Sequence, residues 1–164
     1  MIVAGPNASR VKLKWEKATR LRNDWKELHE KNPALYSIVT HLAGYCGLTL
    51  KKDLVITQIF RTKNEQLAIY GPNTTKKSPH MFHCAVDLRC RDSHFKKEER
   101  EFLERSLRKY DQFNSFGQMP SGSRTVWIHS VGDGGIHFHV QFYGVNRQLP
   151  SYFQLPSAHP SNVV

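Results

Sequence analysis

Four of the nine histidines stand in two tight groups, and their spacing is suited to metal or acid–base chemistry. His137 and His139 are two residues apart in an apolar stretch that predicts a strand. Side chains alternate between the faces of a strand, so both imidazoles point one way while Phe138, Val140 and Phe142 point into the core. Imidazole is a common metal ligand and titrates near neutral pH. The pair therefore marks a candidate site.

The second group consists of His80 and His83, which directly precede another predicted strand, residues 84–89. Asp87 lies in this strand between two apolar residues, which places its carboxylate at a wall of the core. A buried carboxylate needs a cation or several hydrogen-bond donors to offset its loss of water. A metal ion meets that need directly.

Two imidazoles and one carboxylate, with a fourth position left for water, form a common catalytic zinc arrangement. The ion lowers the pKa of such a water and polarises a carbonyl group, and an unused histidine of the pair is placed to act as the base. The alternative is that each histidine is an ordinary surface or core residue and that Asp87 pairs with Arg89 or Arg91.

The elements that must position these residues follow from the periodicity of apolar side chains. We expect helices over residues 10–31, 34–43, around 65–69, and from Asp92 or Ser93 to about Tyr110. Strands are expected over residues 54–60, 84–89, 125–131 and 136–143, the last two forming a hairpin. Helices come first and strands cluster later, which favours the α+β class.

A chain of 164 residues is typical of one domain. We expect a flexible N-terminal arm over residues 1–9, a single domain over 10–147 and a C-terminal tail over 148–164, because both ends are rich in residues that favour loops.

Charge is a further indication of function. Lys and Arg number 24 against 14 Asp and Glu, a formal net charge of +10. Such a surface attracts polyanions, and nucleic acid, bacterial cell walls and anionic lipid are all compatible with it. Cys46, Cys84 and Cys90 form no CxxC pair, which argues against a disulfide scaffold. Neither a transmembrane segment nor a secretory signal is expected.

The stretch from Ser78 to Asp87 resembles the Ser-x-His-x-x-Gly-x-Ala-x-Asp signature of a peptidase family. That family comprises zinc D-alanyl-D-alanine peptidases and phage L-alanyl-D-glutamate endopeptidases; it includes the vancomycin-resistance dipeptidase and shares a metal fold with the hedgehog signalling domain. Ile136-His-Phe-His139 resembles the family's closing His-x-His strand. Residues 56–62, followed by Gln66, are similar to the strand ending in Arg-Ser/Thr that precedes its active-site loop. The likeness spans residues 55–142, roughly half of the chain.

The resemblance implies a small α+β domain whose antiparallel sheet, packed with helices, carries one zinc ion bound by His80, Asp87 and His139. It places His137 near the attacking water, as the base or the transition-state stabiliser. It also places Arg61 opposite the substrate carbonyl, where a fixed positive charge can stabilise a developing oxyanion.

Four further residues are expected around this site. Ser78 would brace a ligand or the substrate. His83 replaces the glycine of the motif, so it is either a solvent-facing substitution or an extra ligand or donor. His129 and Trp127, two residues apart on the neighbouring predicted strand, are candidates to line the same cavity, although a tryptophan at position 127 is more typical of the core.

The function implied is that of a zinc metallopeptidase that hydrolyses an amide bond in bacterial peptidoglycan stem peptides, as a D-Ala-D-Ala carboxypeptidase or an L-Ala-D-Glu endopeptidase. Small size suits a phage lysin or a virion-associated cell-wall hydrolase, made in the cytoplasm and acting on the wall after release or within the virion. Lys76 and Lys77 lie closest to the expected site, where they could meet an acidic substrate.

Two alternatives from other classes remain open. His137-Phe-His139 also fits the His-hydrophobic-His metal motif of enzymes that nick single-stranded DNA, with Lys109-Tyr110 as the nearest match to their nucleophilic tyrosine. A non-catalytic cell-wall-binding relative that retains the fold is the other, because His83 departs from the motif.

Overall fold

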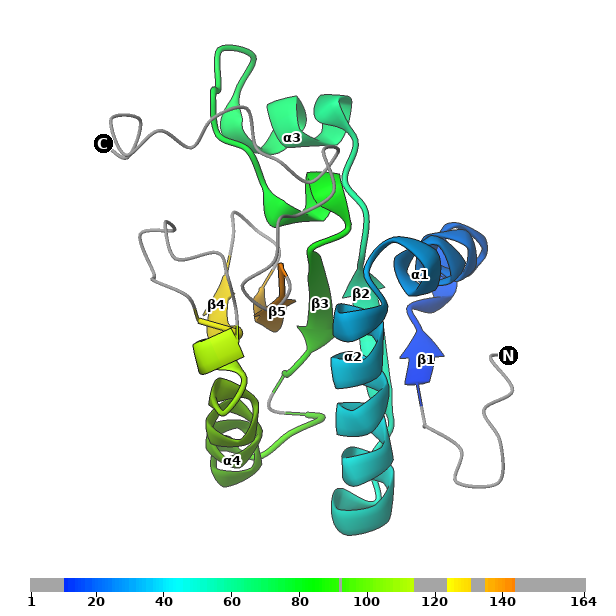
Figure 1. Ribbon diagram of the computed structural model, residues 1–164, viewed down its shortest axis with the longest axis vertical. Coiled ribbons are helices and arrows are strands. Elements are labelled where there is room, and N and C mark those ends of the chain that lie inside the picture. Colours follow the sequence, from blue (N-terminus) through cyan, green and yellow to red (C-terminus); the bar gives the residue numbers. More distant parts are fainter. Residues whose placement is uncertain (1–10, 92, 114–123, 131–134, 144–164) are drawn as a thin grey trace.

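A five-stranded sheet with the strand order β1-β2-β3-β5-β4 forms the centre of the computed structural model (Figure 1). The structure describes residues 11–91, 93–113, 124–130 and 135–143. The strands are Val11–Leu13 (β1), Leu54–Gln58 (β2), Ala85–Arg89 (β3), Val126–Ser130 (β4) and Ile136–Gln141 (β5). The α-helices of this part of the chain are Ala18–Lys31 (α1), Pro33–Tyr45 (α2), Lys63–Tyr70 (α3) and Lys97–Arg108 (α4). Shorter turns of helix are Trp15–Lys17 (η1), the π-helical Cys46–Leu50 (η2), Pro79–Phe82 (η3) and Asp111–Phe113 (η4).

The α+β class is confirmed, but the sheet is mixed rather than antiparallel throughout. β1 pairs with β2 in parallel, whereas β2 with β3, β3 with β5, and β5 with β4 are antiparallel. The expected helix over residues 10–31 is therefore wrong at its start, because residues 11–13 form this added edge strand and α1 begins only at Ala18. The expected arm and tail lie outside the described residues.

The junction between α1 and α2 agrees with the expected break at Asn32-Pro33. The Asn32 side chain accepts a hydrogen bond from the backbone N–H of Leu35, and Pro33 occupies the first turn of α2, where its missing N–H costs nothing. Asn32 also donates from its side-chain nitrogen to the carbonyl oxygens of His83 and Phe142, at 3.1 and 2.7 Å. One side chain thus ties the helix junction to the ends of the chain segments that carry the histidines.

Two helix boundaries differ from expectation. The second helix does not end at residue 43 as expected; α2 runs to Tyr45, passes into the π-helical turn and stops at Lys51 with a left-handed backbone, φ 56°. α4 starts at Lys97 rather than at Asp92 or Ser93, because Glu99 caps the backbone of Lys96 instead.

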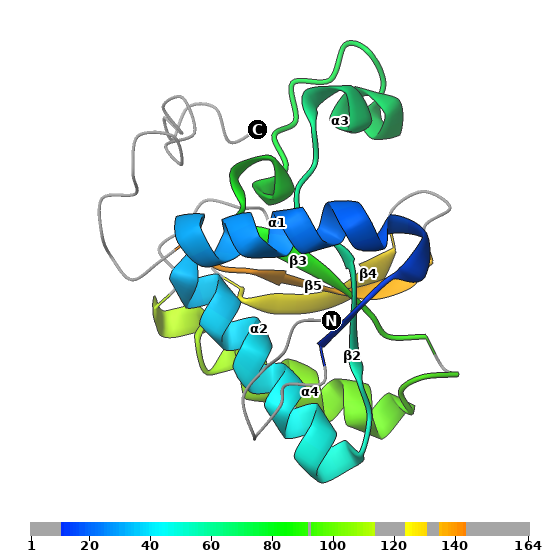
Figure 2. The ribbon, with the colours of Figure 1, turned by 90° about the vertical axis from the view of Figure 1, so that its right-hand side faces the viewer.

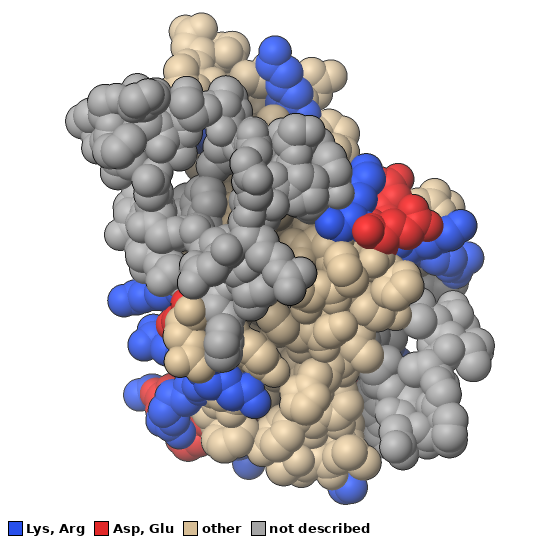
Figure 3. Space-filling view, viewed as in Figure 1, with Lys and Arg blue, Asp and Glu red and all other residues tan. Residues whose placement is uncertain are grey.

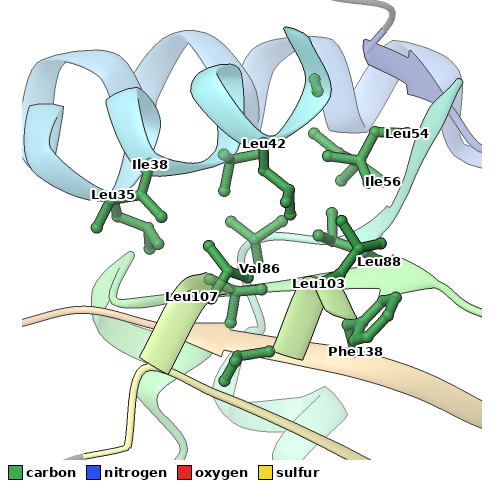
Figure 4. Close-up of a cluster of buried hydrophobic side chains, with 14 of the residues drawn as sticks. Leu35, Ile38, Leu42, Leu54, Ile56, Val86, Leu88, Leu103, Leu107 and Phe138 are labelled. Atoms are coloured by element: carbon green, nitrogen blue, oxygen red, sulfur yellow. The ribbon is translucent and has the colours of Figure 1, made fainter. Parts of the chain in front are cut away.

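α2 and α4 cover one face of the sheet, and α3 lies beyond one end of it (Figures 1 and 2). Leu35, Ile38 and Leu42 of α2 reach into a core with Val86 and Leu88 of β3 (Figure 4). Burying each such aliphatic side chain contributes roughly 1.5–3 kcal/mol, so this face anchors the fold. The opposite face of the same strands is left for polar side chains.

All three cysteines are buried free thiols, as expected from their spacing.

On the face shown in Figure 3, charged side chains gather at the two sides and leave the surface over α2 almost uncharged. None of the helices in the described segments is long and apolar enough to cross a membrane.

Candidate metal centre

The sheet register brings the histidine strands together on the polar face. β3 pairs with β5 so that Asp87 lies opposite His139, and β4 pairs with β5 so that Trp127 lies opposite His139 and His129 opposite His137. Phe138 of β5 is fully buried in the core. The alternation predicted from the sequence is therefore confirmed for these strands.

Three imidazoles surround one oxygen of Asp87. The Oδ1 atom lies 2.9 Å from His139 Nδ1, 3.1 Å from His80 Nε2 and 3.5 Å from His137 Nε2. The exposed fractions are 1% for His80, 7% for Asp87 and 5% for His139. The side chains of the expected ligand set thus converge at a site shielded from water.

The hydrogen bonds of His80 indicate what this cluster requires. Its Nδ1 lies 2.8 Å from the carbonyl oxygen of Ile59, which only accepts, so Nδ1 carries the proton of the neutral ring. The lone pair on Nε2 then faces Asp87 Oδ1, which is also an acceptor. Two acceptors in contact need a proton or a metal ion between them. The cluster is therefore chemically suited to a cation.

The ligand atoms fall into two groups, in each of which all atoms lie within 4.8 Å of one another: His80, Asp87 and His139, and His129, His137 and His139. The first group is the ligand set expected from the sequence, and it is positioned to hold a metal ion. Donors around a tetrahedral ion with bonds of about 2.0–2.1 Å lie roughly 3.3–3.4 Å apart, so the observed contacts need only small outward shifts. His137 is not part of this first group.

The electrostatics of the cluster favour the forms that bind metals. Burial alone would raise the pKa of Asp87, but the imidazoles in contact with its carboxylate, those of His80 and His139, hold that pKa well below the ordinary range. Burial lowers the pKa of His139, and burial together with the neighbouring histidines lowers the pKa of His129 to about 4. An ionised carboxylate and neutral imidazoles are the protonation states of metal ligands.

Arg61 and Ser78 brace the loop that carries His80. The Arg61 backbone N–H donates to the His80 carbonyl oxygen, and its Nη1 donates to Ser78 Oγ at 3.3 Å and to Gln66 Oε1 at 3.2 Å. Ser78 Oγ also accepts from the backbone N–H of His80. No carboxylate of the described residues lies within 4.0 Å of the buried Arg61 guanidinium, so its charge is not neutralised by an ion pair. Ser78 thus contacts the backbone of His80, one of the expected metal ligands, and its bracing role stays a prediction.

The His83 side chain lies away from the cluster around Asp87. Its backbone has φ 55°, the left-handed conformation that the motif's glycine would adopt easily. Its ring is buried, stacks on Phe60 with 4.7 Å between centroids, and places Nε2 3.1 Å from Glu27 Oε2. The expectation of a solvent-facing residue is wrong, and the structure does not bring His83 to the cluster as an extra ligand, because the chain reversal after η3 aims its ring toward α1.

Trp127 and His129 line the same cavity as the cluster, as one reading of the sequence expected. The Trp127 ring lies 4.5 Å from the His139 ring, and the His129 ring 4.6 Å from the His137 ring, centroid to centroid. Both side chains are half-buried. Trp127 is therefore a wall of the cavity and not a core residue.

The cavity has a volume of about 690 Å³ and is strongly basic. Asp87 is the only acidic residue of the described chain that lines it, against seven basic ones: Lys14, Lys17, Arg61, Lys76, Lys77, Arg89 and Arg91. Lys76 and Lys77 line this cavity, which agrees with their expected position near the site. Strand alternation predicts Arg89 on the same face as Asp87. The sequence does not predict that Lys14 and Lys17 line the cavity.

The pair Lys109 and Tyr110 lies at a different, much smaller pocket, lined also by His41 and Tyr45. The tyrosine considered for DNA nicking is therefore not at the candidate metal site.

The chain matches no protein-family model, no curated protein and no solved structure. The family resemblance accordingly rests on the motif residues alone.

Proposed function

We propose that this protein is a zinc-dependent peptidase that hydrolyses an amide bond in bacterial peptidoglycan stem peptides. The observation that carries the proposal is the convergence of His80, Asp87 and His139 on one point, with His137 beside them and outside their group. Two imidazoles and one carboxylate leave a tetrahedral ion one position for water or substrate. A metal ion bound there would supply water activation and polarisation of the scissile carbonyl.

His137 is suited to move the proton. Its Nδ1 lies 3.1 Å from the Gly135 carbonyl oxygen and therefore carries the ring proton, which leaves the lone pair at Nε2. Nε2 faces the cluster, 3.5 Å from Asp87 Oδ1. In this role His137 accepts a proton from the attacking water at Nε2 and then donates it to the leaving amine, a contribution of typically 10²–10⁴-fold to rate.

Arg61 is suited to stabilise the developing oxyanion. Its guanidinium is held by neutral partners, Gln66 and Ser78, and lines the cavity. A charge fixed in advance by such contacts needs no reorganisation when the carbonyl oxygen becomes negative. In this proposal Arg61 therefore supplies a fixed positive charge in the wall of the cavity.

The basic lining of the cavity supports an acidic substrate. A lining of seven basic side chains and one carboxylate attracts the carboxylates of a stem peptide. The choice of peptidoglycan as the substrate comes from the resemblance to the cell-wall peptidases. In this proposal the protein acts on the wall after release from the cytoplasm or as part of a virion, as a phage lysin does. A non-catalytic wall-binding relative would keep the metal without the hydrolysis.

The test is hydrolysis of purified peptidoglycan fragments by the zinc-loaded protein, followed through the appearance of new amino termini. His80→Ala and chelation should each abolish the activity, whereas His41→Ala, at an exposed histidine outside the cavity, should leave it unchanged. Activity that survives both treatments refutes the metal mechanism.

The basic cavity gives one observation in favour of a polyanion such as single-stranded DNA as the substrate. Tyr110, the tyrosine expected for the DNA-nicking alternative, lies at the other pocket, and the tyrosine that lines the cavity of the cluster is Tyr70 instead. Cleavage of single-stranded DNA in the presence of a divalent metal, absent in His80→Ala, would replace the peptidase proposal with this one.

A further inference from the structure

A second group of potential ligands lies against the first. His129, His137 and His139 each offer a nitrogen, and these nitrogens lie within 4.8 Å of one another. The His129 ring is 4.6 Å from that of His137 and 5.3 Å from that of His139. The opposed positions of His129 and His137 in the β4–β5 pair hold these imidazoles in place. The proposed peptidase reaction uses only His137 of this group as a base and gives His129 no role.

Two nitrogens of this group, one on His129 and one on His139, lack hydrogen-bond partners. His139 is 5% exposed, yet its Nε2 makes no hydrogen bond, and the buried Nε2 of His129 makes none either. His137 uses Nδ1 toward Gly135, which leaves Nε2 with its lone pair. Buried polar atoms are nearly always satisfied, so unpartnered nitrogens on adjacent rings indicate a missing ligand.

We propose that His129, His137 and His139 form a second, weaker binding site for a divalent metal ion. Three imidazoles with water in the fourth position are an established zinc arrangement, and imidazole-rich sites also suit copper and nickel. In this site His139 would offer its unpartnered Nε2, while its Nδ1, which faces Asp87, would remain for the first ion.

Three features make the second ion bind less tightly than the first. Its ligand set contains no carboxylate, whereas the first contains Asp87. A neutral His139 ring would have to give up its one N–H proton to bind two ions, and metal binding is weakened when a ligand must be deprotonated. The first ion, once bound through the shared His139, also repels a second positive charge. We expect the two dissociation constants to differ by at least about 100-fold.

Occupation of the second site has a consequence that rests on the proposed function. An ion at this site engages the Nε2 lone pair of His137, which the peptidase reaction needs as its base. Zinc would then activate the protein at low concentration, through the first site, and inhibit it at high concentration, through the second. The same side chain would serve the reaction and its limitation by excess metal.

The experiment is an equilibrium titration of the metal-free full chain with zinc, followed by metal analysis after dialysis at a series of free zinc concentrations. The wild type should bind a first equivalent tightly and a second at least about 100-fold more weakly. His129→Gln should keep the first and lose the second, and His80→Ala should weaken the first. His41→Gln, an exposed histidine outside the cavity, controls for adventitious binding and should match the wild type.

Cobalt provides an independent readout that needs no catalytic activity. The visible absorption added by the second equivalent of cobalt should be absent in His129→Gln, while the spectrum of the first equivalent is retained. A single equivalent in the wild type at all zinc concentrations, or a second one unchanged by His129→Gln, overturns the proposal. Failure of the proposed peptidase function would appear separately, as two bound ions without hydrolysis.

Discussion

Replacing Asp87 by asparagine separates the metal-binding role of the cluster from its contribution to folding. The Asp87 carboxylate is the only anionic group among the first ligand set, and its Oδ1 lies within 3.5 Å of three imidazole nitrogens. Asparagine has nearly the same shape, but it is neutral and is a poor metal ligand. The variant should therefore fold and fail to bind the first ion tightly.

The size of the effect follows from linkage. A metal ion that binds only the folded state stabilises it by about 2.7 kcal/mol at a free concentration of 100 times the dissociation constant. For a chain of 164 residues each kcal/mol shifts the Tm by roughly 2–4 °C, so zinc should raise the Tm of the wild type by about 5–11 °C over its value in chelator. In Asp87→Asn this difference should vanish. The amide oxygen of asparagine still accepts from the His139 imidazole, but as a neutral acceptor, so the metal-free stability should fall by only about 1 kcal/mol.

The assay is a thermal melt by circular dichroism, with zinc and with chelator, for the wild type, Asp87→Asn and Asp53→Asn. Asp53 pairs with Lys12 at 2.6 Å, away from the cluster, so its variant should retain the full zinc-dependent shift. A wild type whose Tm ignores zinc, or an Asp87→Asn protein that keeps the shift, would refute the reasoning that this carboxylate holds the cation.

Three further outcomes are expected. His137→Gln should keep the tightly bound metal but lose about 10²–10⁴-fold in peptidase turnover, measured on stem peptides; loss of the tight metal would instead make His137 a ligand. His83→Gly should be more stable to urea than His83→Ala by about 1 kcal/mol, because φ is 55° there and both variants lose the ring; equal stabilities would contradict a strained backbone. Burial lowers the pKa values of His129, to about 4, and of His139, so the unfolded chain takes up protons first near pH 6.5. Stability in chelator, read from urea midpoints, should therefore be constant above about pH 7 and fall from pH 6.5 toward 4; a flat profile would speak against neutral buried imidazoles.

The cluster was predictable because the rule that places it is local. Alternation along a strand assigns His137 and His139 to one face and Phe138 to the other without knowledge of any neighbour. Asp87 follows from the same rule in β3, whereas His80 as the third expected ligand came from the resemblance to the peptidase family. The structure then adds the register that sets Asp87 opposite His139.

The features that were not predictable depend on long-range pairing or on the backbone of a single turn. β1 is only three residues long and depends on its parallel pairing with β2, which lies about forty residues further along the chain. The local apolar pattern alone predicts the start of a helix there. Lys14 and Lys17 reach the cavity only because of that pairing. The direction of the His83 ring is set by the left-handed backbone after η3, which no spacing of residues reveals.

The charge balance of the cavity connects the proposals. One divalent ion at His80, Asp87 and His139 is only half neutralised by the single carboxylate, so the occupied cluster carries a net positive charge amid seven basic side chains. Such a site binds anionic ligands more tightly than a neutral site of the same shape, and the advantage decreases as salt screens the lining over a Debye length of about 8–10 Å. The same excess of charge explains why a second ion at His129 has to bind more weakly. A carboxylate-bearing substrate that enters the cavity would offset part of that excess, so the substrate and the second metal ion should strengthen each other's binding wherever they do not compete for His137.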